Sequence, residues 1–115
     1  MTSDCIFCRI VAGDASATVV YADGEITAFT DIHPQANVHI LVIPNRHFVS
    51  LNDATDADAG LLGRLVRVAV GVARQAGIEE SGYRVVTNTG SDARQSVDHL
   101  HFHVLGGQRL SARLG

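Results

Sequence analysis

Residues 98–105 read Asp98-His99-Leu100-His101-Phe102-His103-Val104-Leu105. Histidine alternates here with a bulky apolar residue, which is the two-residue period of a β-strand with one buried face. On such a strand the three apolar side chains face the core, and the three imidazoles stand on the opposite side, about 6 to 7 Å apart. Half of the six histidines of the chain lie in this run. Three at this spacing favour a chemical role over a structural one.

The sequence around this run predicts an α+β fold with a mostly antiparallel sheet. Runs of apolar residues bounded by turn residues indicate strands over 18–22, 26–31, 38–43, 83–89 and 100–105. The first two strands flank Asp23-Gly24, which is a strong signal for a hairpin turn.

Two helices are expected. The short one covers residues 5–12, with Ser3 or Asp4 as its N-cap and Gly13 at its end. The long one follows residues 55–58, which resemble a capping box, and ends at Gly77. Its apolar residues form more than one stripe, so it packs either on a second subunit or in a large core. The residues of the second stripe are Leu61, Val66, Val68 and Val70.

Length and composition indicate one domain over residues 1–115. The chain is 46% hydrophobic and 18% charged, which excludes disorder and a coiled coil. The nine cations are scattered and the net charge is −3, so no nucleic-acid partner is expected. We expect neither a membrane span nor an export signal, and therefore a cytoplasmic location. Because disulfides are rare in the cytoplasm, we expect Cys5 and Cys8 to bind a metal or take part in redox chemistry rather than form a structural disulfide.

The three histidines allow two kinds of chemistry near pH 7. They could ligate a catalytic zinc ion, with His39 or His47 as a further ligand. Alternatively, one imidazole attacks an electrophilic phosphorus and forms a phosphohistidine that water cleaves. The polar loop 88–96 offers amides, hydroxyls and backbone N–H groups, and next to three histidines it resembles a cradle for an anion. The residues by themselves leave both mechanisms open.

The run over residues 95–107 resembles the signature of the histidine triad superfamily. The resemblance is to the branch of histidine triad nucleotide-binding proteins, in its bacterial, zinc-containing type. Four further segments match this branch in order: 5–10, 28–36, 39–47 and 88–90. The resemblance implies a five-stranded antiparallel sheet with one long and one short helix, and a homodimer with a ten-stranded sheet. It also implies a purine nucleoside phosphoramidase that releases the nucleoside monophosphate through a nucleotidyl-histidine intermediate and needs no cofactor for catalysis.

The resemblance carries roles onto individual residues. His101 matches the nucleophile, and the catalytic group also includes His103, His39 and Ser96. The phosphate cradle is implied at Asn88, Arg94, Gln95, Ser96, His101 and His103. The nucleoside site is implied at Phe7, Ile10, Phe29, Asp31, Ile32 and Leu41, with the Asp31 carboxylate on the ribose hydroxyls. A structural zinc is implied at Cys5, Cys8, His47 and His99.

Two departures from the family pattern bear on the leaving group. Arg94 stands where a small glycine is usual, and residues 108–115 lack the usual Trp-Pro-Pro-Gly-like ending. Three alternatives therefore stand beside the phosphoramidase. They are a hydrolase or phosphorylase of dinucleoside polyphosphates, a zinc hydrolase with the triad as ligands, and a nucleotide-binding regulatory module without turnover.

Overall fold

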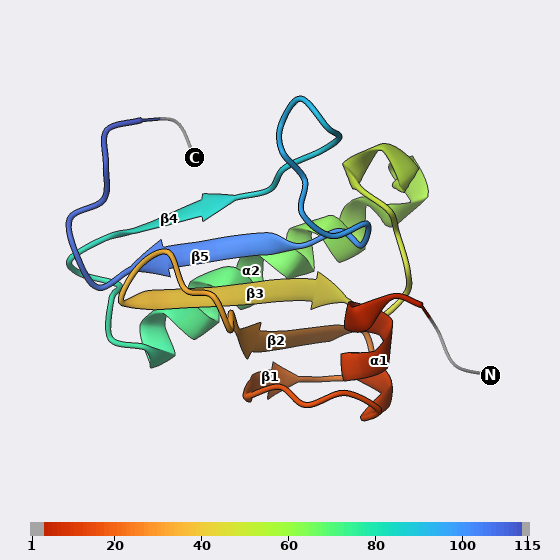
Figure 1. The fold of residues 1–115 in the computed structure, drawn as a ribbon, viewed down its shortest axis with the longest axis horizontal. Coiled ribbons are helices and arrows are strands. Elements are labelled where there is room, and N and C mark those ends of the chain that lie inside the picture. Colours follow the sequence, from red (N-terminus) through yellow and green to blue (C-terminus); the bar gives the residue numbers. More distant parts are fainter. Residues whose placement is uncertain (1–3, 114–115) are drawn as a thin grey trace.

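The computed structural model describes residues 4–113 and contains one five-stranded antiparallel sheet, in the order β1-β2-β3-β5-β4 (Figure 1). The strands are β1 Val19–Ala22, β2 Ile26–Thr30, β3 Val38–Pro44, β4 Tyr83–Val86 and β5 Phe102–Gly106. The helices are α1 Ile6–Ala12 and α2 Ala59–Gln75, and short 3-10 turns cover Leu51–Asp53 and Asp56–Asp58. The predicted α+β fold class, with one long and one short helix, is confirmed.

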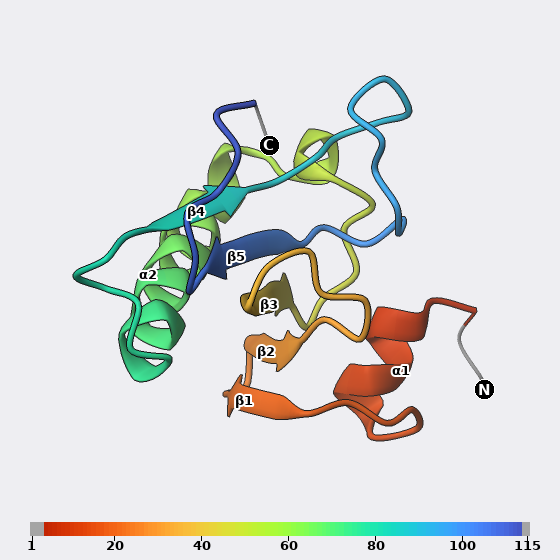
Figure 2. The same cartoon turned by 60° about the vertical axis from the view of Figure 1, so that its left-hand side comes forward.

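The two helices cover opposite faces of the sheet (Figure 2). On the α2 face, Ile40 and Val42 of β3 form one core with Leu65 and Ala69 of the helix. On the α1 face, Leu41 and Ile43 of the same strand pack with Phe7 and Phe29. Consecutive residues of β3 thus serve different clusters, as the alternation of a strand requires. The predicted burial of Leu100, Phe102 and Val104 is confirmed, because all three belong to the α2-face core.

Local turn chemistry explains why the first hairpin and the first helix form. The Asp23 carboxylate accepts hydrogen bonds from the backbone N–H groups of Glu25 and Ile26 at 2.7 and 2.8 Å, which confirms the predicted turn between β1 and β2. Gly13 ends α1 at a φ of 80°, a left-handed conformation that favours glycine.

Three predicted boundaries are wrong by two residues or more. The last strand begins at Phe102 rather than Leu100, because the Leu100 N–H donates to the Phe48 carbonyl, and the His101 carbonyl accepts from the Thr87 hydroxyl. The fourth strand ends at Val86 rather than Thr89. The long helix ends at Gln75, two residues before Gly77.

The caps differ in detail from the predictions. Cys5 is the N-cap of α1 in place of Asp4, because its side chain accepts a hydrogen bond from the Cys8 N–H. Ser3, the other predicted cap, lies outside the described residues. The capping box of Thr55 and Asp58 is confirmed, although it caps the 3-10 turn that leads into α2.

The second apolar stripe of α2 is only partly covered by the core. Leu61 and Val68 pack against the core, whereas Val66 is 45% exposed. Among residues 4–113, no helix has the length and apolar character that crossing a membrane requires.

Candidate active site

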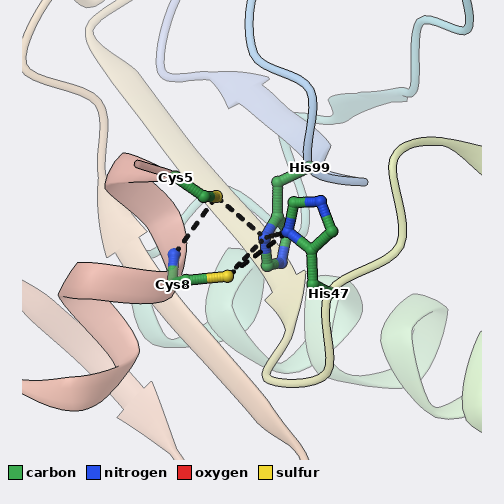
Figure 3. Close-up of side chains that lie close together, drawn as sticks. All are labelled: Cys5, Cys8, His47 and His99. Atoms are coloured by element: carbon green, nitrogen blue, oxygen red, sulfur yellow. Dashed lines mark hydrogen bonds between the residues drawn. The ribbon is translucent and has the colours of Figure 1, made fainter. Parts of the chain in front are cut away.

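Two thiols and two imidazoles converge where α1 meets the loops around β3 and β5 (Figure 3). Cys5 and Cys8 come from the start of α1, His47 follows β3, and His99 precedes β5. Their ligand atoms all lie within 4.8 Å of one another. The Nε2–H of His99 donates to the Pro44 carbonyl at 2.8 Å, which leaves its Nδ1 for the cluster. The four residues that the sequence implied as zinc ligands are therefore brought together.

The spacing in this cluster fits a tetrahedral zinc ion. Nδ1 of His99 lies 3.3 Å from the Cys5 sulfur and 3.6 Å from the Cys8 sulfur, and Nδ1 of His47 lies 3.3 Å from the Cys8 sulfur. The two Nδ1 atoms are 3.2 Å apart. Zinc–ligand bonds are about 2.3 Å long to sulfur and about 2.05 Å long to nitrogen. At tetrahedral angles, these bond lengths place a sulfur and a nitrogen ligand about 3.6 Å apart and two nitrogen ligands about 3.3 Å apart. The carbonyl on His99 is the kind of outer partner that orients a ligating imidazole.

His101 presents the opposite ring nitrogen. Its Nδ1 lies 2.7 Å from the His99 carbonyl, which can only accept, so Nδ1 carries the proton and Nε2 keeps a lone pair. The side chain is 3% exposed and lines a hollow beside α1. Burial lowers the pKa of His101 below its usual value, partly offset by the hydrogen bond to His99. The ring is thus neutral at pH 7, with a lone pair available for attack on an electrophile.

His39 and His103 form a hydrogen-bonded pair beside His101. The Gln35 N–H donates to Nδ1 of His39 at 3.0 Å, which places the proton of the neutral His39 ring on Nε2. This Nε2 lies 2.8 Å from Nδ1 of His103, so His103 accepts there and carries its own proton on Nε2. The His103 ring lies 4.9 Å from the His101 ring. The chain of hydrogen bonds therefore leaves His103 Nε2–H as a donor for a ligand.

Burial keeps this pair neutral. It lowers the pKa of His39, against the opposing charge of Asp31, whose carboxylate lies 3.4 Å from His39 Nε2. The pKa of His103 is lowered to about 4, first by burial and then by the neighbouring His101 and His39. Neutral imidazoles can donate to phosphoryl oxygens and accept from water without the cost of a buried charge.

An apolar hollow of about 470 Å³ lies between α1, β2 and the loop after β2. It is within the size range of small-molecule sites. The six residues that the sequence implied for a nucleoside all line it: Phe7, Ile10, Phe29, Asp31, Ile32 and Leu41. Asp31 lies at its polar end, close to His39. Ile32 is 80% exposed, which makes it the outer wall of the hollow.

The loop between β4 and β5 lines a second, more polar hollow of about 660 Å³. Four of the six residues implied for the phosphate cradle line it, namely Asn88, Arg94, Ser96 and His103, whereas Gln95 and His101 do not. The two hollows share Gln35, His39, Ser96 and His103. They therefore meet at His39 and His103, and the His101 ring lies next to His103.

Several groups of the cradle are used to hold the loop in shape. The N–H groups of Arg94 and Gln95 donate to the carbonyls of Ser91 and Gly90 at 2.9 and 3.1 Å. Asn88 donates to the Ala93 carbonyl, and the Gln95 amide donates to the Val49 and Val97 carbonyls. Among the described residues, Gln95 is absent from the lining of both hollows. Its contacts are those of a residue that fixes the loop.

Sequence reasoning missed three groups that set up the site. Gln35 fixes the tautomer of His39 and lines both hollows, and its position in the matched segment 28–36 was the available signal. The Pro44 carbonyl orients His99, and the Thr87 hydroxyl holds the His101 carbonyl at 2.8 Å. No residue-type signal could reveal these two, because each acts through a tertiary hydrogen bond.

A second group of potential metal ligands consists of Asp31, His39 and His103. Within residues 4–113, neither group contains two histidines of the triad. His99 lies in one group and His103 in the other, while His101 belongs to neither. The geometry thus gives no support to a zinc hydrolase in which the triad itself holds the metal.

Comparisons with known proteins agree with this geometry. The family model described as scavenger mRNA decapping enzyme C-term binding matches residues 4–113. The purine nucleoside phosphoramidase of Escherichia coli K12 is 42% identical over 114 residues, which cover 99% of this chain and 96% of the relative.

Solved structures give the same result. A HIT family hydrolase from Legionella pneumophila has a TM-score of 0.94 and 43% identity, covering 97% of this chain and 100% of that one. A histidine triad protein from Clostridium difficile has a TM-score of 0.94 and 39% identity, covering 99% of both chains. The chain belongs to the histidine triad family.

Proposed function

We propose that this protein hydrolyses purine nucleoside 5′-phosphoramidates with His101 as its nucleophile. The observation that carries the proposal is the buried, neutral His101 ring, whose Nδ1–H is held by the His99 carbonyl while the ring lines the hollow beside α1. The 42% identity to a purine nucleoside phosphoramidase supports this choice of reaction.

The reaction has two balanced steps. In the first, Nε2 of His101 forms a bond to the α-phosphorus, and the bond from phosphorus to the amine nitrogen breaks. The amine takes up a proton, which reaches it from solvent through the neighbourhood of the Ser96 hydroxyl. In the second step, water adds its oxygen to phosphorus and releases a proton, and Nε2 leaves with its electron pair. The products are the amine, the nucleoside monophosphate and the restored neutral His101.

The surrounding residues bind and orient the substrate. The Nε2–H of His103 and the side chain of Ser96 donate to phosphoryl oxygens, and His39 holds His103 in the donating tautomer. Asn88, Arg94 and Gln95 shape the loop on the phosphate side. The Asp31 carboxylate accepts from the ribose hydroxyls. The base lies in the slot made by Phe7, Ile10, Phe29, Ile32 and Leu41.

We further infer that Cys5, Cys8, His47 and His99 hold a structural zinc ion. Two thiolates and two imidazoles form a closed site, and the distances given above fit it. Such an ion supplies folding free energy by fixing the start of α1 to the loops around β3 and β5. Catalysis is proposed to need no cofactor.

The protein is proposed to act as a homodimer that joins two sheets. β4 is an edge strand, and its Val85 is 38% exposed on the same face as Tyr83, which packs on the α2-side core. Val66 of α2 is also exposed. A Val66→Glu, Val85→Glu double variant should sediment as a monomer at concentrations where the wild type is dimeric. A cytoplasmic location and the absence of a nucleic-acid partner stay predictions from the sequence.

The experiment compares AMP release from adenosine 5′-phosphoramidate by the wild type and by His101→Ala. We expect release by the wild type alone, with AMP binding retained in the variant. Equal activity of the two proteins would exclude His101 as the nucleophile. AMP binding by a wild type that releases nothing would favour dinucleoside polyphosphate substrates, or a binding module if those are also left intact.

A further inference from the structure

The second hollow continues past the place where the proposed reaction puts the phosphoryl group. It extends from the shared residues His39, Ser96 and His103 along the β4–β5 loop to Asp92 and Arg94. The base and ribose occupy the apolar hollow in the proposed reaction, and the phosphoryl group lies where the hollows meet. The leaving group therefore extends into the second hollow.

Arg94 has an unusual backbone conformation for a residue with a side chain. Its φ is 61°, and among residues 4–113 it is the only residue other than glycine with a positive φ. An L-residue is strained in this left-handed region, whereas glycine adopts it freely. The chain thus carries a long cationic side chain at a position where glycine would be less strained.

The charges around Arg94 make its guanidinium available to a ligand. Within the described residues, the structure gives Arg94 neither an ion pair nor a side-chain hydrogen bond, and the residue is exposed. Within residues 4–113 it is also the only lysine or arginine that lines either hollow. His39 and His103, which line the same hollow, are neutral at pH 7, and Asp92 is the one carboxylate lining it among the residues that the structure describes.

We propose that Arg94 determines leaving-group specificity and favours leaving groups that carry a carboxylate or a phosphate. This inference rests on the proposed function, because it concerns the group that departs from phosphorus. The Arg94 guanidinium pairs with the anionic group and thereby orients the leaving group. The Asp92 carboxylate repels the same anionic group and so weakens the preference for it. Arg94 is thus a positioning residue for the reaction, since it acts on a part of the substrate that does not react.

The test uses three conjugates in which AMP is joined through a P–N bond to β-alanine, to β-alanine amide or to 2-aminoethyl phosphate. The first two have nearly the same shape and differ by one charge. For the wild type we expect kcat/KM for the carboxylate to exceed that for the amide about fivefold, in the upper range for an exposed ion pair. The phosphate conjugate shows which anion the site prefers.

Four proteins separate charge from backbone effects. Arg94→Gln keeps a side chain at the strained position and should bring the carboxylate-to-amide ratio to about 1, whereas Arg94→Lys should keep a ratio above 1. Asp92→Asn should raise the ratio above that of the wild type. Because each ratio is taken within one protein, a general change in activity cancels. Sodium chloride at 0.5 M should reduce the wild-type ratio.

Each result bears directly on the inference. A wild-type ratio of 1, or an unchanged ratio in Arg94→Gln, would overturn it. Turnover of unsubstituted adenosine 5′-phosphoramidate reports separately on the proposed function. If that substrate is left intact, the charge preference is measured as calorimetric affinity for the three conjugates, and equal affinities for the first two overturn the inference.

Discussion

His99 and His101 are two residues apart, and both are almost fully buried, yet their surroundings differ completely. His99 donates from Nε2 to the Pro44 carbonyl and turns Nδ1 toward two cysteines and His47. His101 donates from Nδ1 to the His99 carbonyl and keeps Nε2 for the hollow beside α1. A single carbonyl on each ring therefore selects which nitrogen is available. Residue type and burial, which are the same for both, do not distinguish the proposed metal ligand from the proposed nucleophile.

The two regions, the Cys/His cluster around His99 and the hollow around His101, are also physically connected. The His99 backbone supplies the carbonyl that orients His101. The Phe7 ring packs edge-on against both imidazoles, with centroids 5.8 Å from His99 and 5.3 Å from His101. Because Phe7 lies between Cys5 and Cys8 in sequence, the segment that carries two of the proposed zinc ligands also carries a wall of the hollow proposed for the nucleoside. Order at the metal site should thus support order at the reacting site.

The largest expected effect comes from replacing each of the two histidines, His99 and His101, by alanine in separate variants. His101→Ala should reduce kcat for adenosine 5′-phosphoramidate by about six orders of magnitude, the scale seen when a nucleophile is lost, and should retain the zinc ion that we propose. His99→Ala should lose zinc and stability. Turnover and zinc content measured on the same preparations decide the matter, and zinc loss in His101→Ala would show that the two regions are not separate.

Removal of zinc should produce the next largest effect, on stability. A ligand present at about 1,000 times its Kd stabilises the folded state by about 4 kcal/mol, so chelation should lower Tm by about 15 °C or more. The measurement is thermal unfolding with and without chelator. Cys8→Ala provides the control, because its Tm should already be low and should not respond to the chelator. A wild-type Tm that is unchanged after verified metal loss would contradict the structural role.

Acid should destabilise the His39–His103 pair. The pKa of His103 is about 4 in the folded protein, against 6.5 ordinarily, because burial and the facing His101 and His39 oppose its charge, while Asp31 favours it. The unfolded chain therefore binds the proton first, and stability is lost as the pH falls from about 6.5 toward 4. Denaturant unfolding of the zinc-saturated protein at several pH values should show a steeper loss for the wild type than for His103→Gln. Equal slopes would mean that His103 contributes nothing to the pH dependence.

The smallest expected effect concerns the link between the two regions. Phe7→Leu removes the ring contacts to Phe29 and His101 and should cost about 1 kcal/mol of stability, with a rise of a few fold in KM. Phe48→Leu is the matched control, since Phe48 is equally buried but lies in the core on the α2 face. It should destabilise the protein to a similar extent and leave KM unchanged. A similar KM in both variants would show that Phe7 serves only packing.

Local sequence patterns predicted much of the fold. The Asp23-Gly24 turn, the Thr55–Asp58 capping box and the burial of Leu100, Phe102 and Val104 follow from hydrogen bonding and periodicity within a few residues. The predicted strand over 100–105 began too early, because Leu100 bonds to Phe48, which lies far away in sequence. The boundary was set by a contact that no local pattern contains.

The candidate site shows the same limit. Family resemblance placed Cys5, Cys8, His47 and His99 in one group, and the structure brings them together. It also implied Arg94 and Gln95 for the phosphate cradle, and the structure shows their N–H groups bonded within the loop. Sequence reasoning could not show this, because the fold of the loop decides which of its N–H groups bond to its own carbonyls and which stay available to a ligand.

The sequence by itself determined the α+β class, the two faces of the last strand and the set of residues able to carry chemistry. These depend on period-two alternation, capping and residue type, which are local. Only the tertiary structure decided which nitrogen of His99 is available, because the Pro44 carbonyl that orients it is 55 residues away. The positive φ of Arg94 is likewise set by how its loop closes between β4 and β5. Either ring nitrogen of a neutral imidazole can carry the proton, so the hydrogen-bond partner of one nitrogen decides whether the other is available to a metal or to a substrate.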